Sequence, residues 1–378
     1  MSVNETFSYS QRIRVLIVDD SAVIRRIIMS TLLKHAEIEV VGTSANGLEA
    51  IEDIKRTKPD LVTLDIEMPK MDGLAALKEI RSFDRHLPII MFSSLTHRGA
   101  EATLDALMLG ASDYVAKPTN LNDSSEAFQA LEESLIPKIK QLGAKKTNAL
   151  ALSRTHAPVS ASPPPLPSPS LNFVPTAVPS TRLRAAPVEA LCIGVSTGGP
   201  AALMQLFTDW KVPLSVPVLI VQHMPPKFPE MLASRLSTLG GVPAVVALEG
   251  QVIEPGHAYL APGGRHMEVH RNALGKVMIR LNDNPPECSC RPAVDVLFRS
   301  AAKVFGNRLL AMVLTGMGND GAAGAAQIVL QGGKVLAQDE ASCVIWGMPG
   351  AVVNANLADK VLPLGELAEE VVARLQSR

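Results

Sequence analysis

A repeated alternation of short apolar runs with longer stretches of helical spacing constrains the fold of this chain more than any other feature. In the first part of the sequence the pattern occurs five times, with apolar runs at Val15–Val18, Ile38–Gly42, Leu61–Leu64, Pro88–Phe92 and Tyr114–Ala116. Short apolar strands that alternate with helices form a parallel sheet covered on both faces. Because crossovers between parallel strands are right-handed, we predict a doubly wound, flavodoxin-like α/β domain with strand order 2-1-3-4-5.

The second half of the sequence repeats this alternation on a larger scale. Its apolar runs stand at Ala190–Val195, Val216–Gln222, Leu309–Thr315 and Gly333–Ala337. Stretches of helical spacing lie at Pro200–Asp209, Phe228–Leu239, Pro292–Phe305 and Asp320–Gln331. Residues Val242–Leu281 have the alternation and the Gly-containing turns of β-hairpins. We therefore predict a second α/β domain, a Rossmann-like parallel sheet with a β-hairpin insertion.

A proline-rich stretch separates the two halves. Residues 158–187 hold nine prolines among Ser, Ala and Thr, a composition that forms neither helix nor sheet and buries little apolar surface. We interpret this stretch as part of an extended linker. At 378 residues the chain is long enough for two domains with a core each. The predicted organisation is a first domain over 1–142, a linker over 143–187 and a second domain over 188–378.

Composition excludes several classes of protein. The net charge of −1 gives no general attraction to nucleic acid or to an anionic membrane. No apolar run reaches the roughly 20 residues of a membrane helix, and Met1–Arg14 has no signal-peptide core, so we expect a cytoplasmic protein without membrane insertion. The four cysteines include Cys288 and Cys290, whose spacing is not the C-x-x-C of zinc or redox sites. We interpret all four as reduced structural thiols.

Polar residues end four strands of the first predicted sheet, and the carboxyl ends of parallel strands share one edge. These residues are Asp19 with Asp20, Asp65, Ser93 and Lys117. Three carboxylates at one edge repel one another unless a cation is present, and carboxylate oxygens with water suit Mg²⁺. A lysine and a hydroxyl beside them indicate a site for a phosphoryl group carried on an aspartate. The alternative is that the first two aspartates only cap a helix.

The first strand of the second half runs into a glycine-rich turn that contains Ser196. Residues Gly194–Gly198 fit the G-x-S-x-G pattern of a nucleophile elbow, and Pro200 suits the first turn of a helix. A serine between strand and helix is exposed and lies beside free backbone N–H groups. The alternative is a phosphate-binding turn, although no lysine follows as in a P-loop and G-x-G-x-x-G is absent.

A serine nucleophile needs a base and an orienting carboxylate. His223 ends the strand "VLIVQH", and Asp320 follows another strand within "LLAMVLTGMGNDG". Three strand ends therefore supply the parts of a Ser-His-Asp triad, although Asp320 also fits a helix cap. Their order along the chain differs from the Ser-Asp-His order of the α/β-hydrolases, which argues against that fold. A competing assignment of the base is His266, which lies in the hairpin region.

The first half resembles the receiver domains of response regulators over roughly residues 12–142. The motifs that carry the resemblance are "VLIVDDS", "LVTLDIEMPKMDG", "PIIMFSS" and "GASDYVAKP". The resemblance implies that Asp65 accepts phosphate from a histidine kinase, and that Mg²⁺ is held by Asp19, Asp20 and Asp65. It also implies that Ser93 and Lys117 contact the phosphoryl group, that the 117–118 peptide bond is cis, and that Tyr114 is a switch aromatic. The alternative for Tyr114 is a half-buried strand residue.

The second half resembles the catalytic domain of the chemotaxis methylesterase family, CheB. The motifs are "IGVSTGGP", "VQHMP", "APGGRHMEV", "RPAVDVLFRSAA" and "LTGMGNDGAAG". The resemblance implies the triad Ser196, His223 and Asp320, with Thr197 and the backbone N–H of Met317 at the oxyanion. It also implies a substrate, γ-glutamyl methyl esters on the cytoplasmic helices of methyl-accepting chemoreceptors, and a second reaction, deamidation of receptor glutamines. We expect no cofactor in this domain, a kinase of the chemotaxis type as partner, and a monomer.

Two other functions compete with this reading. A response regulator whose second domain only binds a partner or DNA predicts a basic output domain with a helix-turn-helix, and the sequence has neither. A serine hydrolase acting on a small metabolite is compatible with the triad. From the two domains and their linker we expect that the unphosphorylated receiver covers the active-site edge and inhibits the hydrolase.

Overall fold

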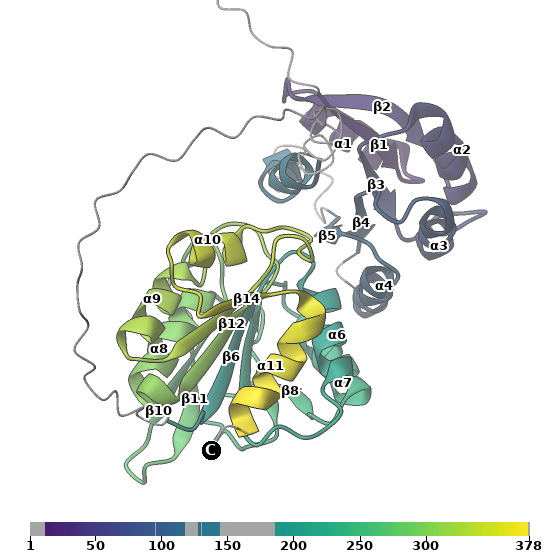
Figure 1. Ribbon diagram of the computed structural model, residues 1–378. Helices are drawn as coiled ribbons and strands as arrows, with labels where there is room; N and C mark the ends of the chain where they lie inside the picture. Colours follow the sequence, from purple (N-terminus) through teal and green to yellow (C-terminus); the bar gives the residue numbers. More distant parts are fainter. Residues whose placement is uncertain (1–11, 95, 118–127, 130, 144–185, 377–378) are drawn as a thin grey trace, which may run out of the picture.

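The computed structural model describes residues 12–94, 96–117, 128–129, 131–143 and 186–376, which form two α/β domains (Figure 1). The predicted linker lies almost entirely outside the described residues. Among the helices that the structure describes, none combines the length and the apolar character needed to cross a membrane.

The first domain contains a five-stranded sheet in the predicted order, β2-β1-β3-β4-β5. Its strands are β1 (Ile13–Val18), β2 (Ile38–Ser44), β3 (Leu61–Asp65), β4 (Ile89–Ser93) and β5 (Asp113–Ala116). Its helices are α1 (Ala22–Leu32), α2 (Gly47–Thr57), α3 (Gly73–Phe83), α4 (His97–Met108) and the helical residues 131–143. Each sheet neighbour is parallel, as the alternation of strands and helices predicts.

Side-chain caps fix where these helices begin. Ser21, Asn46, Asp72 and Thr96 each accept a hydrogen bond from the backbone N–H three residues further on, which satisfies one of the free donors of the first turn. Apolar side chains of α1 and of residues 131–143 share one core on one face of the sheet, while α2, α3 and α4 pack on the other.

The second domain contains a seven-stranded sheet, β14-β13-β12-β6-β7-β9-β8, in which all neighbours are parallel. Its strands are β6 (Ala190–Val195), β7 (Val218–Gln222), β8 (Ala244–Val246), β9 (Ala258–Leu260), β12 (Leu309–Val313), β13 (Lys334–Gln338) and β14 (Lys360–Leu362). Two groups of helices flank the sheet on opposite sides (Figure 1): α6 (Gly199–Asp209), α7 (Phe228–Leu239) and α11 (Leu364–Gln376), and α8 (Val294–Phe305), α9 (Ala322–Leu330) and α10 (Met348–Asn354).

The region expected to consist of hairpins forms only one. β10 (His266–Arg271) and β11 (Val277–Asn282) pair antiparallel as predicted. β8 and β9 instead extend the parallel sheet, so the expectation of hairpins is wrong for them. The two strands have three residues each, and a run this short has no periodicity that distinguishes parallel from antiparallel pairing.

The two domains lie in contact, with β5 and α4 of the first domain closest to the second (Figure 1). The ring of Tyr114 stacks on that of Phe228, with centroids 4.9 Å apart. Ile345 of the second domain packs in the same apolar cluster as Phe92 and Val115 of the first. Apolar burial of this kind stabilises the docked arrangement.

Candidate active site

The sharp turn after β6 places Ser196 between a strand and the start of α6. Gly198 has φ 76°, and a Cβ there would lie 2.6 Å from a side-chain carbon of Val344. The amide of Ser196 donates to the carbonyl of Thr315, 3.0 Å away, which fixes the turn against the loop after β12. The glycine of this turn is therefore required by backbone conformation and by space, and the serine side chain is left partly exposed.

Strand register brings Ser196 and His223 to the same level of the sheet. Val195 pairs with Gln222 across β6 and β7, so the next residue on each strand follows side by side. The buried amide group of Gln222 donates to the carbonyls of both Ser196, at 2.9 Å, and His223, at 3.1 Å. Gln222 thus ties together the backbones of the two candidate catalytic residues, a role that sequence reasoning missed.

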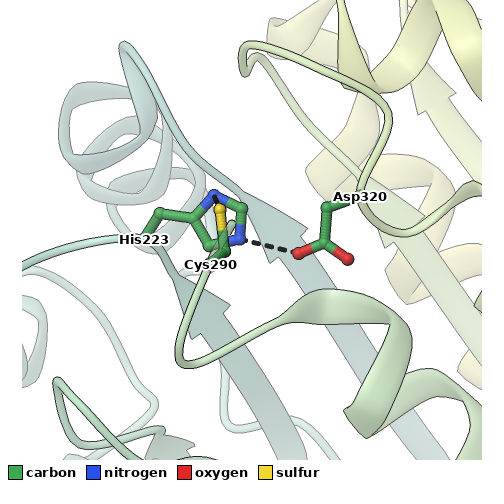
Figure 2. Close-up of side chains that lie close together, drawn as sticks. All are labelled: His223, Cys290 and Asp320. Atoms are coloured by element: carbon green, nitrogen blue, oxygen red, sulfur yellow. Dashed lines mark hydrogen bonds and ion pairs between the residues drawn. The ribbon is translucent and has the colours of Figure 1, made fainter. Parts of the chain in front are cut away.

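His223 and Asp320 form a hydrogen-bonded pair (Figure 2). His223 Nε2 lies 2.8 Å from Asp320 Oδ2. The carboxylate also accepts from the backbone N–H groups of Val294, at 2.6 Å, and Asp295, at 2.9 Å, which begin helix α8. A helix N-terminus stabilises an anion, so the buried Asp320 is held both in place and in its charged form. Its candidate role as a cap of α9 is not observed, because α9 begins at Ala322 and Gly321 is its N-cap.

The electrostatics of this pair follow from burial and from these bonds. Burial acts to raise the pKa of Asp320, but the hydrogen bond from His223 and those from the α8 backbone outweigh it and lower that pKa. Burial acts to lower the pKa of His223, but hydrogen bonds to Asp320 and to Cys290 outweigh it and raise that pKa to about 9. In this arrangement His223 holds a proton at neutral pH.

The second ring nitrogen of His223 faces a cysteine. Cys290 Sγ lies 3.5 Å from His223 Nδ1 and within 4.8 Å of a carboxylate oxygen of Asp320 (Figure 2). Among the described contacts there is no hydrogen bond between the hydroxyl of Ser196 and His223. Since Nε2 is bound to Asp320, Nδ1 is the nitrogen that can serve as base.

The two predicted oxyanion contributors have different surroundings. In the part of the chain that the structure describes, the backbone N–H of Met317 has no hydrogen-bond partner and is available. The hydroxyl of Thr197 is not available, because it donates to Asp113 Oδ2 of the first domain over 2.8 Å, and both residues are buried. Lys138 Nζ lies 2.7 Å from the same carboxylate oxygen. A carboxylate of the receiver therefore binds a predicted oxyanion residue of the second domain. The sequence analysis did not identify Asp113.

The competing base, His266, is held in a structural role. Its ring is buried, its Nδ1 accepts from the backbone N–H of Ala293 at 3.2 Å, and its Nε2 lies 3.1 Å from the carbonyl of Pro285. Both nitrogens are used to hold the loop before α8. The arrangement favours His223 as the base.

The first domain gathers its predicted acidic site at the ends of β1 and β3. One carboxylate oxygen from each of Asp19, Asp20 and Asp65 lies within 4.8 Å of the others, a set of hard oxygen donors that fits Mg²⁺. Lys117 Nζ lies 2.7 Å from Asp65 Oδ2 and 3.0 Å from Asp19 Oδ2. Burial raises the pKa of Asp65 to about 6 despite the hydrogen bond to Lys117. Burial acts to lower the pKa of Lys117, but the carboxylates of Asp65 and Asp19 outweigh it and raise that pKa.

The remaining receiver residues lie near this site but face elsewhere. The buried hydroxyl of Ser93 contacts the carbonyl of Gly99 at 3.0 Å and accepts from Thr103 at 2.7 Å, so it is directed to α4 and not to Asp65. Tyr114 is buried, and its ring packs on Phe228 and is not exposed to solvent. The predicted cis bond before Pro118 lies outside the described residues.

Comparisons with known proteins agree with this arrangement of domains. A sequence model of the family described as CheB methylesterase matches residues 191–371, and one of the response regulator receiver domain matches residues 15–129. A protein-glutamate methylesterase/protein-glutamine glutaminase of Trichodesmium erythraeum is 47% identical over 96% of this chain and 99% of that protein. One from a Nocardioides species is 48% identical over 96% of this chain and 95% of that protein.

A solved structure of the Thermotoga maritima CheB methylesterase catalytic domain is 36% identical, with a TM-score of 0.48, and covers 50% of this chain and 99% of that one. The two full-length relatives carry the assignment, since each matches both domains in the same order. The chain therefore belongs to the CheB methylesterase family, with a response regulator receiver domain ahead of the catalytic domain.

Proposed function

We propose that this chain hydrolyses γ-glutamyl methyl esters on the cytoplasmic helices of methyl-accepting chemoreceptors, and that it deamidates receptor glutamines by the same chemistry. The observation that carries the proposal is the His223–Asp320 pair, 2.8 Å apart, at the strand edge beside the Ser196 turn. Family membership supports the substrate, because the relatives are named protein-glutamate methylesterase/protein-glutamine glutaminase. The chain would act in the cytoplasm, where these helices lie.

The proposed mechanism is acyl transfer through Ser196. His223 Nδ1 takes the hydroxyl proton of Ser196, whose oxygen attacks the ester carbonyl. The backbone N–H of Met317 stabilises the oxyanion, and the hydroxyl of Thr197 joins it once Asp113 has left. The leaving methoxide takes its proton from His223 and departs as methanol. Water then attacks the acyl-enzyme, with His223 again as base, to release glutamate and Ser196.

We further propose that Asp65 of the receiver accepts a phosphoryl group from a histidine kinase of the chemotaxis type. Asp19, Asp20 and Asp65 would hold Mg²⁺, which would neutralise charge on the phosphoryl oxygens. Lys117 already contacts Asp65 and would pair with the new group. Ser93 would engage it after its hydroxyl turns away from the carbonyl of Gly99.

The receiver would inhibit the esterase while it is unphosphorylated. Two contacts support this: Asp113 holds the hydroxyl of Thr197, and Tyr114 stacks on Phe228, five residues after the candidate base. Both receiver residues belong to β5, which pairs with β4 where that strand ends at Ser93. A change at the phosphoryl site can therefore reach the inhibitory contacts through one pair of adjacent strands.

Release of methanol from a methylated chemoreceptor fragment tests the proposal. Ser196→Ala should reduce the rate by at least about 10³-fold, because members of a triad act as a unit. The same variant should still take up phosphate from acetyl phosphate, since Asp65 lies in the other domain. Hydrolysis of a small ester with no hydrolysis of methylated receptor would contradict the substrate, and full activity of Ser196→Ala would contradict the mechanism.

A further inference from the structure

Cys290 stands in the loop between β11 and α8, against the one ring nitrogen of His223 that Asp320 does not bind. Its Sγ lies 3.5 Å from Nδ1, the distance of a weak hydrogen bond between sulfur and nitrogen (Figure 2). The other ring nitrogen, Nε2, is held by Asp320 at 2.8 Å, and the sulfur lies within 4.8 Å of a carboxylate oxygen of Asp320. Thiol, imidazole and carboxylate therefore form one compact cluster, in which the imidazole can serve as base to the thiol.

The other cysteines have different surroundings. Cys192 and Cys343 are buried, and burial raises the pKa of Cys192 far above its ordinary value. Cys288 is exposed, but its pKa is raised by partial burial and by the carboxylates of Asp320 and Asp295. Cys290 is half-buried, so a small reagent can reach it, and its neighbour is an imidazole that can take its proton. An adjacent imidazolium is what makes a cysteine reactive in proteins.

We propose that Cys290 is a covalent modification site, an activated thiol that reacts with small soft electrophiles and in its modified form blocks Nδ1 of His223. The proposal gives this cysteine a role beyond that of the structural thiol predicted from the sequence. The loss of esterase activity rests on the proposed function, whereas the reactivity of the thiol does not.

Iodoacetamide serves as the probe electrophile. The neutral form of His223 takes the thiol proton at Nδ1, and the thiolate of Cys290 attacks the methylene carbon of the reagent. A sulfur–carbon bond forms, the carbon–iodine bond breaks, and iodide leaves with its electron pair. The added acetamide group is then attached 3.5 Å from Nδ1, the nitrogen that serves as base in the proposed mechanism.

The test is labelling of the folded full-length chain with a small excess of iodoacetamide in a chelating buffer, followed residue by residue with mass spectrometry. Cys290 should be alkylated at least about ten times faster than Cys288, although Cys288 is the more exposed of the two. Esterase activity should fall with the same time course. The matched variants are Cys290→Ser, whose activity should resist the reagent relative to its own untreated rate, and Cys288→Ser, whose activity should still be lost.

His223→Gln separates activation from mere exposure, because it should slow alkylation of Cys290 by about tenfold while leaving that of Cys288 unchanged. Alkylation of Cys290 no faster than that of Cys288, or at an unchanged rate in His223→Gln, would overturn the proposal. Labelling should proceed equally in Ser196→Ala, which lacks the esterase. A failure of the modification site is thereby distinguished from a failure of the proposed function.

Discussion

His223 makes one contact on each ring nitrogen, and the two contacts have opposite consequences for catalysis. Asp320 at Nε2 orients the ring and stabilises its protonated form, as a base in acyl transfer requires. Cys290 lies against Nδ1, the nitrogen that accepts the serine proton in the proposed mechanism. His266, by contrast, uses both nitrogens to hold backbone. The two histidines therefore lend themselves to a direct comparison.

His223→Ala should lower the esterase rate by at least about 10³-fold. His266→Ala should lower the free energy of unfolding by about 1–3 kcal/mol, because a buried backbone N–H loses its acceptor, and should lower the rate far less. Steady-state kinetics and thermal denaturation of both variants measure this. The reverse ranking of the two rates would identify His266 as the base.

The pH dependence of the esterase follows from the raised pKa of His223. The imidazolium cannot accept a proton, so the activity of the unphosphorylated chain should be low at neutral pH and rise as the pH increases through about 9. Cys290→Ala removes one of the hydrogen bonds that raise this pKa, and the rise should move to lower pH. A pH–rate profile of kcat/KM for both chains provides the measurement. An identical profile for the two would show that the thiol does not influence the base.

The raised pKa of His223 also makes the stability of the fold depend on pH. The pKa is raised from 6.5 to about 9 on folding, so the native state binds this proton more tightly than the unfolded chain. The stabilisation it gives is complete below pH 6.5 and disappears as the pH rises through about 9.

At the level of elements, the turn between β6 and α6 is the least tolerant segment of the site. At Gly198 an added Cβ meets both a positive φ of 76° and Val344 at 2.6 Å. Gly275, in the turn between β10 and β11, is a matched control, with φ 77° and nothing within 4 Å of the added Cβ.

Gly275→Ala should cost about 1 kcal/mol of unfolding free energy, from the backbone conformation alone. Gly198→Ala should cost about 1–3 kcal/mol more and lower the esterase rate, because the contact with Val344 displaces the turn that carries Ser196. Urea denaturation gives both values. Equal losses in the two variants would mean that the loop around Val344 yields freely to the new methyl group.

Element ends were the part of the site that sequence could predict. Ser196, His223 and Asp65 all follow apolar strands, and parallel sheets bring such residues to one edge. No comparable pattern predicts where the loop that carries Cys290 lies. Its backbone passes through positive φ at Cys288 and Ser289, conformations that neither a period of two nor one of 3.6 predicts.

Residues whose partner lies in the other domain were likewise beyond sequence. Asp113 begins β5, and nothing in its own segment indicates that Thr197 is its partner, 84 residues further on. The sequence also did not predict β14, α10 and α11. For β14 the reason is simple: it is a three-residue, largely exposed edge strand with little apolar signal.

At the scale of the whole molecule, the receiver contacts the esterase domain both at a proposed oxyanion residue and at positions farther from the candidate site. Asp113 bonds to Thr197, whereas Asp105 pairs with Arg235 of α7 at 2.6 Å on a more exposed part of the interface. These two aspartates allow inhibition by occupation of the site to be separated from docking in general.

A fragment beginning at Ala186 should hydrolyse methylated receptor faster than the unphosphorylated full chain and should not respond to a phosphodonor. Asp113→Ala in the full chain should raise the unphosphorylated rate by about tenfold, since a buried hydrogen bond to a charged group is worth about 1.5–3 kcal/mol. Asp105→Ala should change it by less than about threefold, as expected of a partly exposed ion pair.

Asp65→Asn should remove the response to acetyl phosphate in an otherwise intact chain. A fragment no faster than the full chain would contradict inhibition by the receiver. A phosphorylated full chain faster than the fragment would mean that the receiver also stimulates the esterase directly.

The hydrogen bond between Asp113 and Thr197 also couples the binding of receptor substrate to the equilibrium between the docked and the separated receiver. In the proposed mechanism a methylated helix fills the esterase site only after the receiver has withdrawn, so substrate and phosphoryl group favour the same separated state. Linkage is reciprocal: whatever factor phosphorylation adds to substrate affinity, bound substrate must add to the affinity of the receiver for a phosphoryl analogue. Receptors rich in methyl groups would thus hold this enzyme in its active form, and the response would end as its own substrate is consumed.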